Sequence, residues 1–242
     1  MTIVITFGIG LVIGALIKMI ANLIIDEKSI LNLTSWKELN YKMLIPIFQW
    51  RFILDRNKEV LESIVLQVIM GTIAMLLYSH YGLTIRFGSY TFFSVMLLLI
   101  GFIDFKTTYV YRSTTLITAI GGLILISLES FQIKLWPIDA LFGSLIGSVV
   151  IGLIVWLTGG MGEGDLEIAA LCGLAVGIKG ILLTLFIGFV AGGLAGMTLL
   201  ALKVKEKKDE MAFGPYLVFG CFTAMIWGQT IIDTYLRIIS IS

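Results

Sequence analysis

Two aspartates at the edges of long apolar runs are the residues of this sequence best able to do chemistry. Asp104 ends the apolar run 98–103, and Asp165 closes the segment Gly-Glu-Gly-Asp at 162–165. An unpaired charge in such a place costs at least a few kcal/mol in a membrane, so each aspartate is a candidate functional residue. If the two carboxyls meet, they share one proton, because like charges that close cannot both ionise. One then acts as base and the other as acid, as peptide hydrolysis by an activated water requires.

Each aspartate also has a purely structural alternative. Asp104 could be an interfacial charge that reaches toward Lys106 or Arg112. Asp165 could simply cap the helix that follows it. The four glycines in 159–164 favour a site instead, because glycine lets backbone approach a substrate strand. The crowding of Glu163 and Glu167 into the same turn argues in the same direction.

Other kinds of catalytic site lack the residues that they need. His80 is the only histidine and falls on the opposite side of the predicted topology, which excludes a histidine triad or a His-rich metal site at the aspartates. Cys172 and Cys221 each lie within an apolar segment, so we expect buried thiols and no disulfide framework. We therefore expect no metal.

The composition predicts an all-α polytopic membrane protein. Of the 242 residues, 58% are hydrophobic and only 14% are charged, and the mean hydropathy is +1.02. Apolar runs recur along the whole length with no room for a second, soluble domain, so we expect one membrane domain over 1–242. The net charge of +1 argues against nucleic acid as a partner. The first run has no basic segment before it and is expected to be a retained helix.

We expect about eight transmembrane helices, of which the third, fourth and sixth are short. Short helices suit places where helix ends line a polar cavity, and the third and sixth adjoin the aspartates. The expected spans are 2–25, 61–78, 90–103, 115–128, 138–157, 166–178, 181–202 and 213–232.

Basic residues set the expected orientation. With the amino terminus outside, twelve Lys and Arg fall in inner loops, four fall outside, and Lys18 lies within the first span near its inner end. Both aspartates then lie at the cytoplasmic face. The segment 26–60 mixes charged and aromatic residues, which predicts a cytoplasmic or interfacial loop in contact with lipid; a role in binding substrate is the alternative.

Three motifs together resemble the type IV prepilin peptidases, a family of membrane aspartic proteases with a G-x-G-D motif. They are Phe-Ile-Asp at 102–104, Gly-Glu-Gly-Asp at 162–165 and Phe-Gly-Pro at 213–215. The resemblance implies that Asp104 and Asp165 are the catalytic pair. It also implies a bacterial cytoplasmic-membrane enzyme that cleaves the basic leader of prepilin-like or pseudopilin proteins on the cytoplasmic side, without a cofactor. We expect supporting or substrate-binding roles for Gly162, Glu163, Gly164, Glu167, Lys106, Phe213, Gly214 and Pro215.

The sequence departs from this family in ways that bear on methylation and specificity. Many members also methylate the new amino terminus with S-adenosylmethionine and carry paired Cys-x-x-Cys motifs that bind zinc, but 26–59 contains no cysteine. Glu167 stands where the family often has Lys, and the Pro expected several residues after Asp104 is replaced around Tyr109. These changes indicate a divergent branch in which the methyltransferase activity is in doubt.

Three other functions are compatible with intramembrane carboxylates. A small proton-coupled secondary transporter would place them near the bilayer midplane and would show an inverted repeat. A membrane scaffold would use them only in ion pairs with basic loops. Within the proteases, an intramembrane protease of presenilin type is the nearest alternative. The oligomeric state and the particular substrate are not specified by the sequence.

Overall fold

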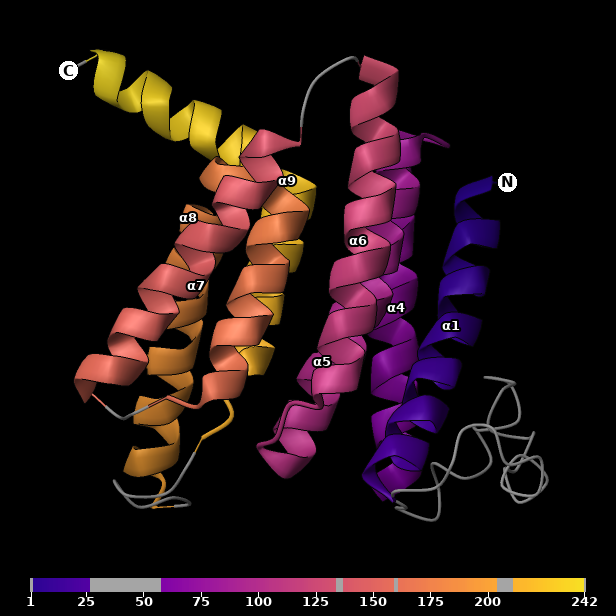
Figure 1. The fold of residues 1–242 in the computed structure, drawn as a ribbon. Coiled ribbons are helices and arrows are strands. Elements are labelled where there is room, and N and C mark those ends of the chain that lie inside the picture. The colour runs from indigo at the N-terminus through magenta and orange to yellow at the C-terminus, as the bar shows by residue number, and fades with distance from the viewer. Residues whose placement is uncertain (1, 27–57, 134–136, 159–160, 204–210, 242) are drawn as a thin grey trace. The chain divides into compact units, whose positions relative to one another are not determined.

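The computed structural model describes residues 2–26, 58–133, 137–158, 161–203 and 211–241, and every element in these ranges is a helix (Figure 1). Two compact units, 1–87 and 88–242, divide the chain, and each is described by itself. Seven described helices are long and apolar enough to cross a membrane. The helices are α1 (Thr2–Ile25), α4 (Lys58–Tyr81), α5 (Ile85–Thr107), α6 (Arg112–Ile133), α7 (Ile138–Thr158), α8 (Glu163–Ala201) and α9 (Gly214–Ile241).

The predicted spans agree with these helices in order, and the differences lie at their ends. The spans expected to be short at 90–103 and 115–128 are full-length helices. Polar residues extend both helices past the apolar stretch, such as Arg86 and Thr107 in α5 and Arg112 and Glu129 in α6. Two predicted spans, 166–178 and 181–202, together form α8. Most of the predicted loop at 26–60 lies outside the described residues, and α4 begins at Lys58.

In the first unit, α1 packs closely on α4 through two glycines one turn apart. A Cβ on Gly10 would lie 2.6 Å from the Cα of Gly71, and one on Gly14 would lie 2.5 Å from the Cα of Gln67. Small residues at such a spacing let the backbones of membrane helices approach one another.

A glycine interrupts α8 and turns it back on itself. Gly177 has φ 71 and ψ −171, which is not helical. A straight helix of 39 residues would be about 58 Å long, roughly twice the thickness of the hydrocarbon core. Figure 1 shows the chain reversing here, so that 163–176 and 178–201 are separate segments. The carboxylate of Asp139 on α7 accepts a hydrogen bond from the N–H of Ile178 at 3.3 Å, which caps the second segment.

The fold-back has a direct consequence for the position of Asp165. Gly192, in the second segment of α8, lies against the ring of Phe213, immediately before α9. The start of α8 and the start of α9 therefore meet at the same end of the unit. The end of α5 joins them there, because Asp104 contacts Gly214.

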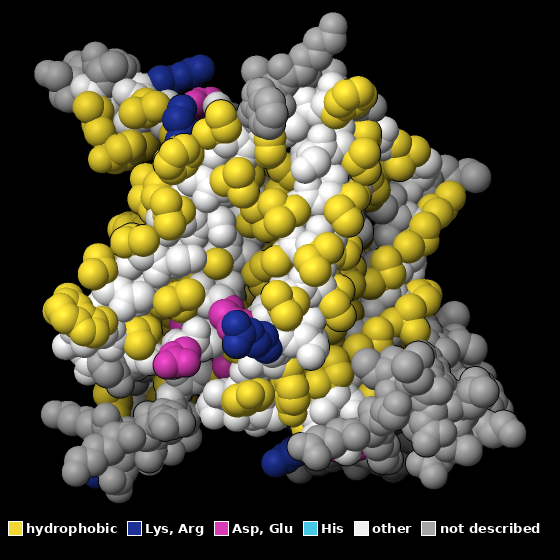
Figure 2. Space-filling model, viewed as in Figure 1, with side chains coloured by type: hydrophobic (Ala, Val, Ile, Leu, Met, Phe, Trp, Pro, Cys, Tyr) yellow, Lys and Arg dark blue, Asp and Glu magenta, His cyan; other side chains and the backbone are white. Residues whose placement is uncertain are grey.

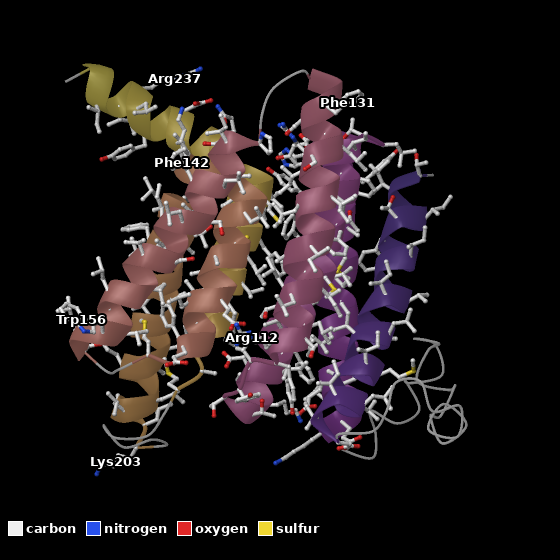
Figure 3. The ribbon with its side chains drawn as sticks, in the orientation of Figure 1. Arg112, Phe131, Phe142, Trp156, Lys203 and Arg237 are labelled. Atoms are coloured by element: carbon white, nitrogen blue, oxygen red, sulfur yellow. The ribbon has the colours of Figure 1, made fainter. Side chains whose placement is uncertain are left out.

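The outer surface of the second unit is apolar along its helices. Phe131 on α6 and Phe142 and Trp156 on α7 project outward in Figure 3, with exposed fractions of 84%, 51% and 79%. Figure 2 shows apolar side chains along these helices, with one cluster of acidic and basic groups in the lower middle of the view and another at the upper left. Such a surface is suited to contact with lipid.

Candidate active site

Asp104 lies in the last turn of α5 and is almost completely buried, at 4% exposure. Its backbone carbonyl accepts the N–H of Thr108 at 2.7 Å, which closes the end of the helix. Its carboxylate Oδ2 accepts the backbone N–H of Gly214 at 3.1 Å. The start of α9, which is distant from Asp104 in the sequence, therefore holds the Asp104 carboxylate in place.

Gly214 reaches Asp104 because of how α9 begins. The carbonyl of Phe213 accepts the N–H groups of Tyr216 and Leu217, so Gly214 is in the first turn, where N–H groups have no partner within the helix. Pro215 fits the same turn, because it has no N–H to leave unsatisfied. The N–H of Gly214 also interacts with the Asp165 carboxyl. The positive end of the α9 dipole thus faces both acids.

Asp165 is the third residue of α8 and is 6% exposed. Its Oδ2 accepts the N–H of Gly162 at 3.2 Å, and its own N–H bonds to the Gly162 carbonyl at 3.1 Å. Part of the structural alternative therefore holds, since Asp165 does cap its helix. Capping uses one oxygen and leaves the carboxyl in contact with a cavity.

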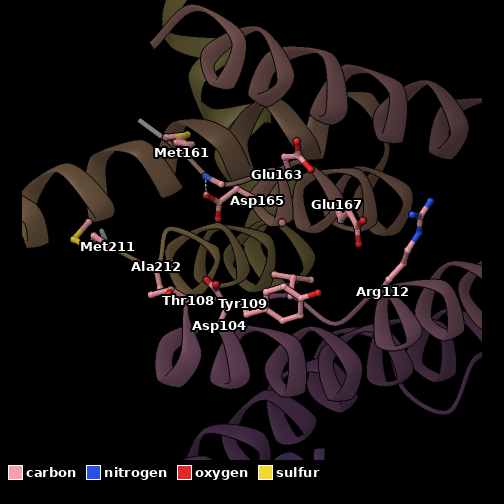
Figure 4. Close-up of a pocket in the computed structure, with 13 residues that line it drawn as sticks. Asp104, Thr108, Tyr109, Arg112, Met161, Glu163, Asp165, Glu167, Met211 and Ala212 are labelled. Carbon is pink, nitrogen blue, oxygen red and sulfur yellow. Dashed lines mark hydrogen bonds between the residues drawn. The ribbon is translucent and has the colours of Figure 1, made fainter. Parts of the chain in front are cut away.

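One cavity of about 460 Å³ contains both aspartates (Figure 4). Their carboxyl groups point toward each other from α5 and α8, and their charges interact. Glu163 and Glu167 also line it, with Arg112 at the rim. The cavity can hold a few residues of an extended peptide and a water between the two acids. The remaining lining residues are Thr108, Tyr109, Val110, Met161, Gly162, Gly164, Met211 and Ala212.

Comparison with known proteins identifies this arrangement. Residues 91–197, which include both aspartates, match the type IV leader peptidase family. That part of the chain is therefore similar to the type IV leader peptidases. The matched segment ends before α9, so Gly214 lies outside it.

Curated proteins similar to this chain carry the name prepilin leader peptidase/N-methyltransferase. One from Stutzerimonas stutzeri is 27% identical over 80% of this chain and 70% of its own length. One from Pseudomonas aeruginosa is 35% identical over 41% of this chain and 36% of its own length. One from Bacillus subtilis is 26% identical over 42% of this chain and 43% of its own length. No solved structure matches the chain significantly.

The other predicted site residues differ in whether they line the cavity. Gly162, Glu163, Gly164 and Glu167 line the cavity. Gly214 holds Asp104 from α9, as described. Three further residues are not among the lining residues: Lys106, Phe213 and Pro215.

Lys106 and Phe213, which do not line the cavity, each lie beside an aromatic ring. Lys106 is exposed, with its ammonium 5.8 Å from the ring centre of Phe102. Phe213 is buried beside Phe189, at 5.4 Å between ring centres. Both positions are close to the site along the chain but face away from its centre.

Sequence reasoning missed the wall formed by the connection between α5 and α6. Val110 lies over Gly164, where an added Cβ would be 2.6 Å from Val110 Cγ2. Thr108 has φ 53, a left-handed conformation that β-branched residues rarely adopt. The only available signal was that this segment directly follows Asp104. Its packing on the glycine turn could not be predicted from sequence.

Proposed function

We propose that this protein is a membrane aspartic endopeptidase that removes the leader of prepilin-like proteins on the cytoplasmic side. The observation that carries the proposal is the meeting of Asp104 and Asp165, from two different helices, in one cavity. The match of residues 91–197 to the leader peptidase family supports the reaction type. The names of the relatives supply the class of substrate.

In the proposed reaction, a water lies between the two carboxyls. The ionised carboxylate takes a proton from this water as its oxygen attacks the scissile carbonyl, and the protonated carboxyl donates to the oxygen that becomes negative. The C–N bond then breaks as the amine takes the proton held by the first aspartate, and the second aspartate takes back a proton from the gem-diol as the new carboxyl group forms. The N–H of Gly214 orients Asp104 throughout. Glycines at 162 and 164 let the peptide backbone come close to Asp165.

We further propose that 1–242 acts as one peptidase domain in the bacterial cytoplasmic membrane, with the amino terminus outside. The excess of Lys and Arg in the expected inner loops supports this orientation. Within α5 and α8, Asp104 and Asp165 lie in a terminal turn rather than at mid-helix. That position fits cleavage at the membrane edge better than a transporter site at the bilayer midplane.

Methyl transfer from S-adenosylmethionine is a separate question. The relatives' names include N-methyltransferase, but no group in the described cavity is specific to this cofactor, because its ammonium and sulfonium would suit the acids and its carboxylate would suit Arg112 as the groups of a peptide would. We therefore derive no step through it.

Replacement of each aspartate tests the proposal. Asp104→Asn and Asp165→Asn, expressed separately with a prepilin, should each reduce cleavage by about 10²–10⁴-fold, because each removes one proton-transfer group. Asp233→Asn is the matched control, since Asp233 is an exposed aspartate on α9 outside the cavity. Retained cleavage in either dyad variant would remove the two-aspartate mechanism.

Mass spectrometry of the product's new amino terminus should accompany these assays. It reports the cleavage position directly, and it reports methylation as the added mass of one methyl group. A wild-type protein that is folded in the membrane and cleaves no prepilin would contradict the proposed function.

A further inference from the structure

We propose that Glu167 binds a cationic side chain of the substrate beside the two aspartates. This inference rests on the proposed function, because it concerns the peptide that Asp104 and Asp165 would cleave. It names a residue that determines specificity without taking part in proton transfer.

Glu167 is positioned by a contact from another helix. It lies on α8, two residues after Asp165, and lines the same cavity. Its Oε2 accepts a hydrogen bond of 2.6 Å from the hydroxyl of Thr115 on α6. Thr115 is 6% exposed, so the bond is sheltered from water. A carboxylate held in this way loses less conformational freedom when it binds a ligand.

The charge of Glu167 is not neutralised within the part of the chain that the structure describes, where no ion pair reaches it. The one base that lines the cavity, Arg112, is exposed at the rim (Figure 4). Four acidic residues line the same cavity: Asp104, Glu163, Asp165 and Glu167. Even with one proton shared between the aspartates, negative charge exceeds positive charge in the cavity, which favours a cationic ligand.

The dimensions of the cavity place that ligand near the scissile bond. An extended peptide advances about 3.3 Å per residue, and a cavity of about 460 Å³ holds only a few residues. Glu167 and the dyad line this one space, so a Lys or Arg within a few positions of the cleaved bond can reach the glutamate. A partly buried ion pair of this kind discriminates more strongly than an exposed one.

Reversal of the charge in the substrate and at Glu167 tests the proposal. A set of prepilin substrates carries Lys or Glu at each position near the scissile bond, and kcat/KM is measured for wild type and Glu167→Lys. Wild type should favour Lys at one position by about tenfold, equivalent to about 1.4 kcal/mol. In Glu167→Lys the preference at that same position should invert. A structural role of Glu167 would lower the cleavage of all substrates alike.

Two further variants sharpen the result. Glu129→Lys makes the same change on α6 outside the cavity and should leave the preference as in wild type. Thr115→Val removes the hydrogen bond that positions Glu167 and should weaken the preference about threefold without inverting it.

The outcomes separate this inference from the proposed function. If wild type cleaves prepilins but Glu167→Lys keeps the wild-type preference or affects all substrates equally, the role of Glu167 is wrong and the peptidase remains. If wild type cleaves no substrate while folded, both fail.

Discussion

Gly214 supports Asp104 in a way that no other residue type could. Its N–H donates to Asp104 Oδ2 at 3.1 Å, and a Cβ added to it would lie 2.5 Å from the same oxygen. The backbone of α9 can approach the carboxylate only because Gly214 has no side chain. The hydrogen bond to Asp104 therefore requires glycine at position 214.

Gly214→Ala should therefore cause a large loss of peptidase activity and only a small loss of thermal stability. The added methyl group also meets Ile168 Cδ1 at 2.5 Å, so Asp104 must move out of its position. Displacement of a reacting group by about 1 Å can cost about 10²-fold in rate. Prepilin cleavage measured beside thermal unfolding in detergent should show the larger change in cleavage.

Gly193→Ala is the control for this substitution. Gly193 lies in α8 with nothing within 4 Å of an added Cβ, and alanine is the better helix former by about 1 kcal/mol. We expect unchanged cleavage and equal or higher stability. Equal cleavage by Gly214→Ala and Gly193→Ala would contradict the positioning role.

Gly164 and Val110 form a second contact that can be tested by compensation. Gly164→Ala places a methyl group 2.6 Å from Val110 Cγ2, which should push the connection between α5 and α6 off the glycine turn. We expect cleavage to fall about tenfold or more, because this connection forms a wall of the cavity.

Val110→Ala added to Gly164→Ala should restore much of the lost activity, because it removes the methyl groups that collide. Val110→Ala alone provides the remaining corner of the double-mutant cycle. Additive losses in the double variant would show that the two residues act independently and that the predicted collision does not occur.

The sequence predicted the helices and the two aspartates because strong local signals specify them. Apolar runs of sufficient length identify membrane helices, and Asp104 and Asp165 stand out against those runs. The lengths of the helices were underestimated, since polar residues at the helix ends are not part of the apolar signal.

The contacts that complete the site could not be predicted in the same way. Val110 matters through Gly164, and Thr115 through Glu167. Each pair comes from two different helices or connections, and nothing in the local sequence specifies the contact. The separate predicted spans 166–178 and 181–202 agree with the reversal in α8, but Gly177 was not identified as the residue that makes it, because a lone glycine in an apolar run does not reveal its φ.

The reversal in α8 should depend on Gly177 and on Asp139 together. Gly177 has a backbone conformation that is essentially restricted to glycine, and an added Cβ would collide with the Asp139 carboxylate. Gly177→Ala should lower the free energy of unfolding by about 1–3 kcal/mol.

Asp139→Ala removes the cap of Ile178 and should cost about 1 kcal/mol. Unfolding in detergent, followed by circular dichroism, measures both changes. If Gly177→Ala were as stable as wild type, the chain would not need this backbone conformation to fold back.

Lys18 and Glu62 form a salt bridge between α1 and α4, with Nζ and Oε2 2.6 Å apart and side-chain exposures of 5% and 27%. Glu62→Gln removes the carboxylate of this salt bridge from the buried Lys18 ammonium. Loss of one partner of a fully buried pair costs about 3–5 kcal/mol, and the partial exposure of Glu62 reduces the expected loss to about 1–3 kcal/mol. The double variant Lys18→Met/Glu62→Met removes both charges and should be more stable than Glu62→Gln, because the buried ammonium is removed together with the carboxylate. Unfolding in detergent compares the three proteins. A double variant less stable than Glu62→Gln would mean that burial of the ammonium does not account for the loss of stability.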